Sequence, residues 1–467
     1  MYTNFGLNKN IFQKIINEAL RNGGDYADIF FQHSISSDII IQEDIVKNTS
    51  NSISLGVGIR VIDGEQTGYA FTNDLSLHKL LETAQAAAAI ARTNSKLKIR
   101  GLNKQNLDFN LYDYKSNLVN NSIKTQISLA RKAYDAAKSY DKKIDKVSVN
   151  LSSTLSDITI VNSEGMIVSD IRPQIRLMVS ATANSGKNTA TATSNDGGRY
   201  NIDFFKIQSK PEEIGKRAAE ESLILLDAKN APSGEMTVVL DSRESGVMIH
   251  EAIGHPLEAD AIRNKTSVMW DKLGLMVANP NVTIYDHPNI EGFRGSLNID
   301  DEGMQTQETL LVENGKLVGF MNDYLSSKIL GHSRNAHGRR QSYKFPPIPR
   351  MSNTILAPGN YSDEEIISSV DYGILAKSFQ GGMVNSTGKF TFSINLGYLI
   401  ENGKITSPIK NATLIGSNLE ILNRIEMVGQ NTNFFLGTCG KSGQSVPVTA
   451  GTPTLKISKM TVGGIND

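Results

Sequence analysis

The alternation of hydrophobic and polar positions predicts regular helices and strands throughout the first half of the chain. Apolar residues recur at helical spacing in four segments: Ile11–Asn22, Leu75–Arg92, Ser122–Ser139 and Pro211–Leu226. Asn73 or Asp74 is the expected cap of the second helix. Strand-like patterns occupy the segments between them: Tyr26–Phe31, Ser52–Ile62, Gln66–Phe71, Lys146–Ser169 and Arg176–Thr193. Asp63-Gly64 and Asn162–Gly165 are turn sequences, so hairpins are expected there.

The pattern changes after residues Asp227–Gly234, where Pro232 and Gly234 interrupt it. Short strands and glycine turns then dominate, with one helix that begins at Arg243 or Glu244 and ends near His255. Leu310–Leu317 and Tyr398–Ile405 each read as strand, Asn-Gly turn and strand. The predicted fold class is α+β. A mixed helix and antiparallel-sheet N-terminal part (1–228) precedes a strand-rich C-terminal domain (229–467) that carries this helix, the candidate metal-binding helix of the motif described below. A further division of the first part into about 1–115 and 116–228 stays open.

Charge and cysteine usage narrow the classes of protein that the chain can represent. Its 467 residues include 48 Lys plus Arg and 48 Asp plus Glu, so the formal net charge is zero. The chain therefore has no net positive charge that would attract nucleic acid or an acidic membrane. A single cysteine excludes an internal disulfide framework and is typical of a reducing compartment. No apolar run approaches the roughly 18 residues of a membrane span, and Met1–Asn10 has no signal-like run. We therefore expect a cytoplasmic protein.

The strongest chemical signal is the segment His250–His255, in which two histidines bracket Glu251 and its neighbours. The segment is apolar on several sides, so a buried location is expected, and buried ionisable groups need partners. Two core histidines with hydrogen-bond partners are the structural alternative. Two imidazoles plus the thiolate of Cys439 would instead supply three zinc ligands and leave a fourth position for water. Glu251 could then take a proton from that water.

The spacing of the two histidines differs from the zincin motif. Histidines four residues apart share one helix face, because four residues turn about 400°. His250 and His255 are five residues apart, which leaves them roughly 140° out of phase in a regular α-helix. They converge only if a π-bulge resets the phase or if the helix ends at Gly254 and the chain turns back. Pro256 favours an end of the regular helix at this point.

Cys439 lies in the glycine-rich segment Leu436–Gly443, which reads as a polar loop. Three roles stay open for it: a metal ligand, a nucleophile or a buried structural cysteine. Lys441 could lower the pKa of its thiol. The same segment resembles the end of a phosphate-binding loop, but position 435 is Phe435 where that motif needs glycine.

A second polar segment, Gly338–Arg350, contains three arginines, Arg339, Arg340 and Arg350, and is kinked by the prolines at 346, 347 and 349. Their guanidinium groups could clamp a carboxylate or a peptide backbone, although a solvated loop is the simpler interpretation. The other histidines are isolated, and surface positions are expected for them: His33, His78, His287, His332 and His337.

Several motifs make the chain resemble the TldD/PmbA family of bacterial and archaeal proteins, once called modulators of DNA gyrase. The resemblance covers nearly the whole chain and rests on these segments: Gly56–Val61, Gly68–Phe71, His250–Glu258, Gly338–Arg340, Ile348–Thr354, Gly381–Asn385, Gly388–Phe392, Gly451–Leu455 and Thr461–Gly464. The TldD branch of that family keeps the His-Glu-x-x-x-His motif and the late cysteine, and this chain has both.

The resemblance implies a zinc-dependent peptidase that cuts short or unfolded peptides. By this resemblance His250, His255 and Cys439 hold one zinc ion per chain, and Glu251 is the general base or acid. It also implies a homodimer, or a heterodimer with an inactive TldE/PmbA-like paralogue, that encloses the active site. Three rivals remain: a non-catalytic regulatory protein with a structural metal, a cysteine hydrolase that uses Cys439, and an inactive scaffold, against which the retention of all three ligands weighs.

Overall fold

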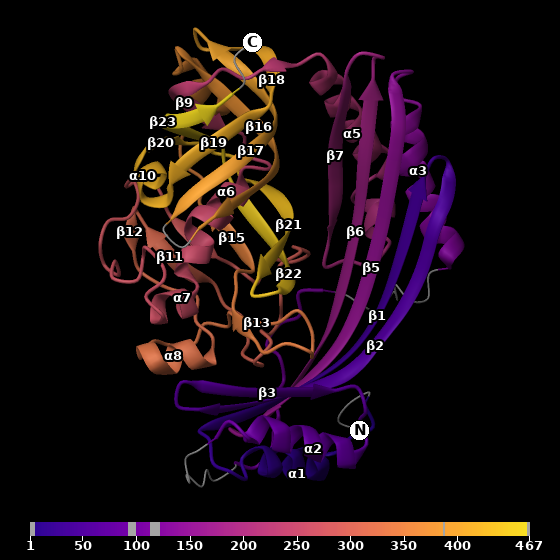
Figure 1. Cartoon of the computed structure of the whole chain (residues 1–467), viewed down its shortest axis with the longest axis vertical. Coiled ribbons are helices and arrows are strands. Elements are labelled where there is room, and N and C mark those ends of the chain that lie inside the picture. The colour runs from indigo at the N-terminus through magenta and orange to yellow at the C-terminus, as the bar shows by residue number, and fades with distance from the viewer. Residues whose placement is uncertain (1–4, 92–99, 113–121, 386–387, 465–467) are drawn as a thin grey trace.

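The computed structural model describes residues 5–91, 100–112, 122–385 and 388–464. Figure 1 shows long strands of the N-terminal half rising beside the sheets of the C-terminal half. The polypeptide is a mixed α+β structure, as the sequence pattern predicts. The proposed division at 115/116 and the end of the second predicted helix at Arg92 lie outside the described residues.

The N-terminal half is built on one seven-stranded sheet with the order β3-β2-β1-β5-β6-β4, to which β7 adds by pairing with β6. Four of its strands have 17 to 19 residues and pair antiparallel over most of their length. The strands are β1 (Tyr26–Gln42), β2 (Ile45–Asp63), β3 (Gln66–Thr72), β4 (Asn103–Lys104), β5 (Ile144–Asn162), β6 (Met166–Asn184) and β7 (Thr189–Gly198).

Helices cover this sheet in two groups, each above its own hydrophobic core. The first group packs on the β1–β2–β3 end, and the second on the β5–β6–β7 region (Figure 1). The helices are α1 (Lys9–Ala19), α2 (Leu77–Ala88), α3 (Ile123–Lys138), α4 (Phe204–Ile207) and α5 (Pro211–Leu226). Alanines on α3 and α5 let these two helices approach each other and the sheet closely, because small side chains reduce the interhelical distance.

The C-terminal half contains two larger sheets. In the first, the order β16-β9-β23-β19-β17-β18-β8 and an added β16–β17 pairing close five strands into a small barrel, with β20 attached to β23. Its strands are β8 (Lys229–Asn230), β9 (Gly234–Leu240), β16 (Tyr372–Val384), β17 (Lys389–Glu401), β18 (Lys404–Lys410), β19 (Ala412–Ser417), β20 (Ile425–Val428) and β23 (Leu455–Gly463).

The second C-terminal sheet has the order β12-β11-β10-β15-β22-β21. It consists of β10 (Ile284–Asp286), β11 (Thr309–Glu313), β12 (Lys316–Leu317), β15 (Asn353–Leu356), β21 (Asn433–Lys441) and β22 (Gln444–Thr452), and a separate ribbon pairs β13 (Gly338–Arg339) with β14 (Ile348–Pro349). The segment α6 (Gly246–Ile249) packs on β15, β21 and β22, and the turn that follows it reaches β16 of the barrel. The histidine segment is therefore held between both sheets, within the largest hydrophobic core.

Several predicted elements are confirmed. α5 has the predicted bounds, and both Asn-Gly turns form hairpins, with positive φ at Asn314 and Asn402. Other predictions were wrong. Ser76, not Asn73 or Asp74, is the cap residue of α2, and Asp74 accepts a hydrogen bond from its N–H. The C-terminal half also has further short helices: α7 (Ala259–Arg263), α8 (Tyr324–Leu330), α9 (Asp363–Ser368) and α10 (Asn418–Asn423).

Candidate metal centre

The chain around the two histidines changes its helical type twice. After α6, residues His250–Gly254 form a π-helical turn, in which the N–H of His255 donates to the carbonyl of His250. His255–Leu257 then form a 3-10 turn that contains Pro256. The wider π turn adds one residue per turn, so residues five apart return to one face. The spacing that contradicts a regular α-helix is thus resolved by the π turn, one of the two distortions that the sequence left open.

Close packing fixes the position of this segment. At Gly246, a Cβ atom would lie 2.6 Å from the carbonyl oxygen of Ala450 on β22, so only glycine allows α6 to lie this close to the sheet. At Gly254, a Cβ atom would meet the sulfur of Met351 at 1.9 Å. These two glycines let the backbone before and after the π turn approach its neighbours.

The side chains of His250, His255 and Cys439 converge at the end of the π turn. Each offers one ligand atom, and these atoms lie within 4.8 Å of one another. The Sγ atom of Cys439 is 3.3 Å from Nε2 of His255, and the two imidazole rings are 5.1 Å apart in an edge-to-face arrangement. The sequence motif and the distant cysteine therefore meet in one cluster.

The surroundings of Cys439 correct one prediction. It lies in the strand β21, not in a loop, and is 4 % exposed. Burial alone would raise the pKa of its thiol, but His250 and His255 lower that pKa to about 4. Lys441 is not the cause, because its ammonium group pairs with Glu258 and Asp260 at 2.9 and 2.7 Å.

Glu258 is a site residue whose role the sequence did not reveal. Its Oε2 lies 2.8 Å from Nδ1 of His255, which leaves Nε2 of that ring directed at Cys439. Burial would raise the pKa of Glu258, but His255 and Lys441 lower it to about 2. A carboxylate that holds the second nitrogen of a ligand histidine fixes the ring orientation and raises its basicity. The one sequence signal that could have indicated this role is the position of Glu258 three residues after His255, about one helical turn away.

Glu251 lies beside this cluster but is not one of its three candidate ligand residues. Its Oε2 is 3.9 Å from Nε2 of His255. Burial raises the pKa of Glu251, the two histidines lower it, and the net direction is upward. A raised carboxyl pKa suits a group that accepts a proton and then releases it near neutral pH.

The donor set fits a zinc ion. Two imidazole nitrogens and one thiolate are ligands that zinc prefers, and three protein ligands with an open fourth position are typical of catalytic sites. The Nδ1 atom of His250 is buried and has no hydrogen-bond partner among the described residues. A buried imidazole nitrogen without a partner is costly, so its state favours a ligand over a core histidine.

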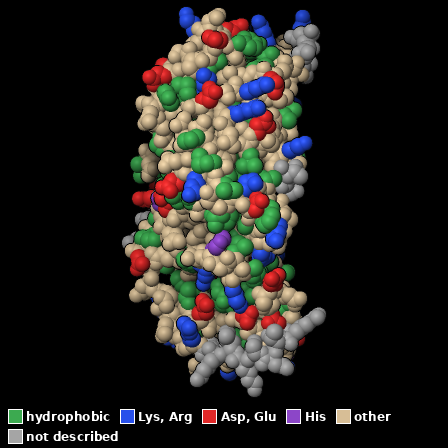
Figure 2. All heavy atoms as spheres, turned by 90° about the vertical axis from the view of Figure 1, so that its left-hand side faces the viewer, with side chains coloured by type: hydrophobic (Ala, Val, Ile, Leu, Met, Phe, Trp, Pro, Cys, Tyr) green, Lys and Arg blue, Asp and Glu red, His purple; other side chains and the backbone are tan. Residues whose placement is uncertain are grey.

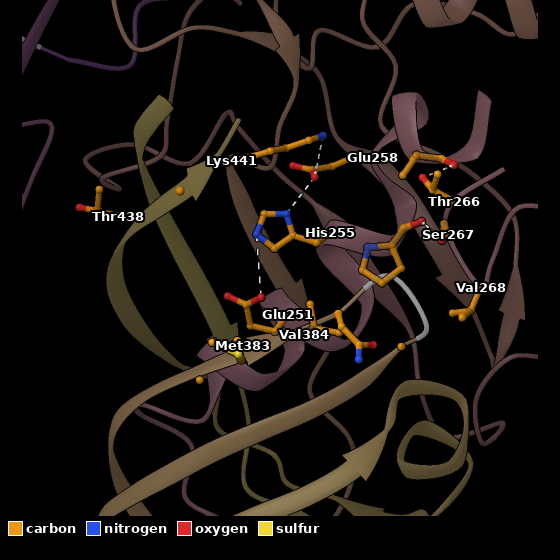
Figure 3. A pocket seen from close by; sticks show the side chains of 16 residues that line it. Glu251, His255, Glu258, Thr266, Ser267, Val268, Met383, Val384, Thr438 and Lys441 are labelled. Carbon is orange, nitrogen blue, oxygen red and sulfur yellow. Dashed lines mark hydrogen bonds and ion pairs between the residues drawn. The ribbon is translucent and has the colours of Figure 1, made fainter. Parts of the chain in front are cut away.

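A cavity of about 550 Å³ opens beside the cluster and is lined by Glu251, His255, Glu258 and Lys441. Figure 3 shows Glu251 and His255 facing each other, with Glu258 and Lys441 on the opposite side of the imidazole from Glu251. Met383 and Val384 of β16 form one wall, and Thr438 lies across β21 from His255. The cluster is therefore accessible from a space that is large enough for part of a peptide.

The three arginines of the Gly338–Arg350 segment are buried, so the simpler interpretation as a solvated loop was wrong. Arg339 donates to the carbonyls of Met351 and Pro447, and Arg350 donates to the carbonyl of Cys439 at 2.6 Å. Arg340 pairs with Asp28 of β1 at 3.4 Å. These guanidinium groups thus clamp the chain's own carbonyls and carboxylates.

One histidine also contradicts its predicted position. His337 is fully buried, and its ring nitrogens lie 3.1 Å from the carbonyl of Arg350 and 3.0 Å from Oγ1 of Thr309. It supports the segment that carries Arg350 and does not reach the metal cluster.

Glu244, which precedes α6, gives a prediction for pH dependence. Burial raises its pKa to about 7, although the N–H of Phe379 donates to it at 3.0 Å. The native state then binds more protons than the unfolded state from about pH 4.5 to 7, so stability falls as pH rises through that interval. We expect Glu244→Gln to be roughly 2 kcal/mol more stable than wild type at pH 8 and equal to it at pH 5.

Thermal unfolding at both pH values measures this difference. Glu313→Gln, at an exposed position of β11, is the matched control and should behave as wild type. A Glu244→Gln midpoint that is raised equally at pH 5 and pH 8 would contradict the titration of Glu244.

The surface gives no indication of a large single-sign patch on the face that Figure 2 shows, where acidic, basic and hydrophobic side chains are interspersed. Among the described residues, no helix is both long and apolar enough to cross a membrane.

Comparisons with known proteins place the chain in the metallopeptidase class and specify its family. Models of the PmbA/TldA metallopeptidase family match three segments: domain 1 at residues 27–91, the central domain at 117–226 and the C-terminal domain at 233–464. The chain belongs to this family, the TldD/PmbA family that its motifs resemble.

Similar proteins match along nearly the whole chain. The metalloprotease TldD homolog of Haemophilus influenzae is 39% identical over 95% of this chain and 93% of its own length. A zinc metalloprotease TldD homolog of Saccharolobus solfataricus is 30% identical over 97% of this chain and 99% of its own length.

Two solved structures share the fold. A putative modulator of a DNA gyrase from Thermotoga maritima is 24% identical with a TM-score of 0.80, over 97% of this chain and all of that chain. TldE from Thermococcus kodakarensis is 19% identical with a TM-score of 0.79, over the same shares.

Proposed function

We propose that this protein is a zinc-dependent peptidase of the TldD type, with one zinc ion per chain held by His250, His255 and Cys439. The observation that carries the proposal is the convergence of three ligand atoms within 4.8 Å beside a cavity that Glu251 lines. Relatives named metalloprotease and zinc metalloprotease support it. The balanced charge and the single cysteine favour a cytoplasmic enzyme that does not bind nucleic acid directly.

When bound, zinc supplies a Lewis acid that polarises the peptide carbonyl and acidifies water. Glu251 accepts the proton of the attacking water at its carboxylate and passes it to the nitrogen of the leaving amine. Glu258 keeps the proton of His255 on Nδ1 and so keeps Nε2 free as a ligand. Arg350 holds the carbonyl of Cys439 and fixes the position of the thiolate.

The substrate class that fits this cavity is an extended, short or unfolded peptide. Gly381–Val384 of β16 pair with β17 along one edge, and no other described strand pairs with them along the opposite edge. Gly382 and Met383 also line the cavity. A peptide that adds to this free edge binds through its backbone, which gives affinity without selecting a sequence.

We further propose that the protein works as a dimer, either of two copies or with a TldE/PmbA-like paralogue. The structural likeness to a protein named TldE supports a family of two related subunits with one fold. The rival in which the metal is structural and the protein a non-catalytic regulator predicts no hydrolysis in any assembly.

Metal removal tests the proposed function. Dialysis against a chelator is expected to abolish the hydrolysis of unstructured peptides, and stoichiometric zinc should restore it. In the proposed mechanism zinc supplies the Lewis acid that activates the peptide carbonyl, so the reaction stops without it. The protein is assayed alone and with a paralogue. Hydrolysis that survives metal removal and disappears on thiol alkylation would instead favour the cysteine hydrolase.

A further inference from the structure

Four arginines form a cluster beside the strand β21: Arg176, Arg199, Arg294 and Arg339. Other buried arginines of this chain form ion pairs, such as Arg60 with Glu302 and Arg172 with Asp301. Among the described residues, the four donate instead to neutral oxygens, and no ion pair includes them. Asp301 offsets part of the charge of Arg199 and Arg339 from a distance, whereas no carboxylate does so for Arg176 or Arg294 among the described residues. Buried cations without a counter-charge are costly, so an anion beside Arg176 and Arg294 would stabilise them.

Two of these arginines are only partly buried, and both contact β21. Arg294 donates through Nε to the carbonyl of Gly437 at 3.0 Å and through Nη2 to Oγ1 of Thr438 at 3.3 Å. Arg176 donates through Nη2 to the carbonyl of Leu436 at 3.5 Å. Their remaining N–H groups are available to a ligand, because a guanidinium carries five donors.

This pair contacts the residues of β21 that directly precede the proposed ligand Cys439. Thr438 precedes Cys439 and lines the cavity of the metal cluster, on the side of β21 away from His255 (Figure 3). Leu436 lines a second cavity of about 470 Å³. At about 3.3 Å per residue, Leu436 and Thr438 lie roughly 3–10 Å from Cys439 along the strand. An extended peptide covers that distance with one to three residues.

The electrostatics of the pair favour the binding of an anion. Burial lowers the pKa of Arg294 to about 9, with repulsion from Arg176, Arg199 and Arg339 acting in the same direction. Among the described residues, the acids that line the second cavity form no ion pair with either arginine. Asp196 accepts a hydrogen bond from Ser209, and Glu244 accepts one from Phe379.

We propose that Arg176 and Arg294 bind a carboxylate of the substrate peptide, one to three residues from the bond that is cut. Guanidinium groups fit carboxylates through paired N–H donors. The carbonyls of Leu436 and Gly437 already accept hydrogen bonds from these arginines. A substrate can therefore bind here through the end of its chain or through a side chain more readily than by pairing with β21 as a further strand. The C-terminal carboxylate and an Asp or Glu side chain supply the same chemistry. This inference rests on the proposed peptidase function.

The test measures peptide binding to the zinc-loaded Glu251→Gln protein, so that it does not depend on turnover. One labelled unstructured peptide is made in three forms: with a C-terminal carboxylate, with a C-terminal amide, and with the amide plus a Glu in place of a Gln near that end. We expect a form with the recognised carboxylate to bind about tenfold more tightly than the plain amide, because hydrogen bonds to charged groups are strong. The form that gains affinity identifies the source of the carboxylate.

Arg294→Gln and Arg176→Gln, introduced into the Glu251→Gln protein, should reduce this ratio of affinities to about one. The ratio separates carboxylate recognition from general damage, which weakens all three forms alike. Arg424→Gln is the matched control, because Arg424 also donates to a carbonyl, that of Lys459, and should keep the wild-type ratio. Equal or undetectable binding of the three forms, or a ratio that survives in the double variant, would overturn the carboxylate site.

The two proposals fail in different ways. Peptides that bind with a preference for carboxylate but are not cut by the wild-type holoenzyme would contradict the peptidase function alone. Cleavage by the wild type with no preference among the three forms would contradict the arginine site alone.

Discussion

Replacement of Glu251 by glutamine is expected to lower kcat for peptide hydrolysis by about 10²–10⁴-fold, while zinc stays bound. Glutamine keeps the shape of the side chain beside His255 but cannot accept the proton of the attacking water. Because Glu251 is not one of the three ligand residues, the metal content should not change. Steady-state kinetics with an unstructured peptide, together with metal analysis of the same sample, measure both quantities.

A surface glutamate provides the control for this result. Glu364→Gln, at an exposed position of α9, should leave both kcat and zinc content at the wild-type values. Activity that survives in Glu251→Gln would assign the proton transfer to another group, and loss of zinc from it would mean that Glu251 belongs to the ligand shell.

The second large effect is expected from Cys439→Ser. A serine hydroxyl keeps its proton near neutral pH, whereas the pKa of the Cys439 thiol is lowered to about 4 by the neighbouring histidines. Zinc therefore loses its only thiolate ligand, and we expect the metal content to fall from about one ion per chain to near zero after dialysis, with loss of hydrolysis.

Elemental mass spectrometry of dialysed protein measures the metal, and circular dichroism checks the fold. Ser445→Ala, an exposed position on the neighbouring strand β22, is the control and should retain zinc. Full zinc occupancy in Cys439→Ser would place the metal on other residues and remove the basis of the three-ligand site.

The elements that the sequence predicted well are those with local signals. The bounds of α5 follow from Pro211 at its start and a regular apolar stripe, and the hairpin at Asn402–Gly403 follows from a two-residue turn that both residues favour. Long strands were recognised only in part. β1 continues to Gln42, well beyond the predicted end at Phe31, because its second part is stabilised by pairing with β2 and β5.

The errors arise where distant pairing decides the structure. Gly437 and Gly440 made the Cys439 segment resemble a loop, but pairing with β22 makes it a strand. Arg339 and Arg350 looked solvated, yet carbonyls from distant segments satisfy them in the interior. No local pattern contains these partners. The boundary of the two halves near residue 228 stays a prediction.

In the candidate site, too, local signals were predicted from the sequence and long-range contacts were not. The motif singled out His250, Glu251 and His255 as candidates, and only the fold brings Cys439 close to the two histidines. The π turn was one of two geometries compatible with the five-residue spacing, and the sequence could not select it because the packing of Gly246 and Gly254 on distant segments decides it.

The contact of Arg350 with Cys439 has a consequence for how zinc enters. His255 and Cys439 are 184 residues apart, and closing so long a loop carries an entropy cost that a metal ion must overcome when it alone joins the two ends. Here Arg350 donates to Cys439 and lies 3.8 Å from the carboxylate of Glu258, which in turn orients His255. The loop is thus closed by the polypeptide itself. We expect the metal-free chain to stay folded, so that zinc binds to and leaves a preformed site. The fraction of active enzyme then depends on the free zinc concentration and not on the rate of folding.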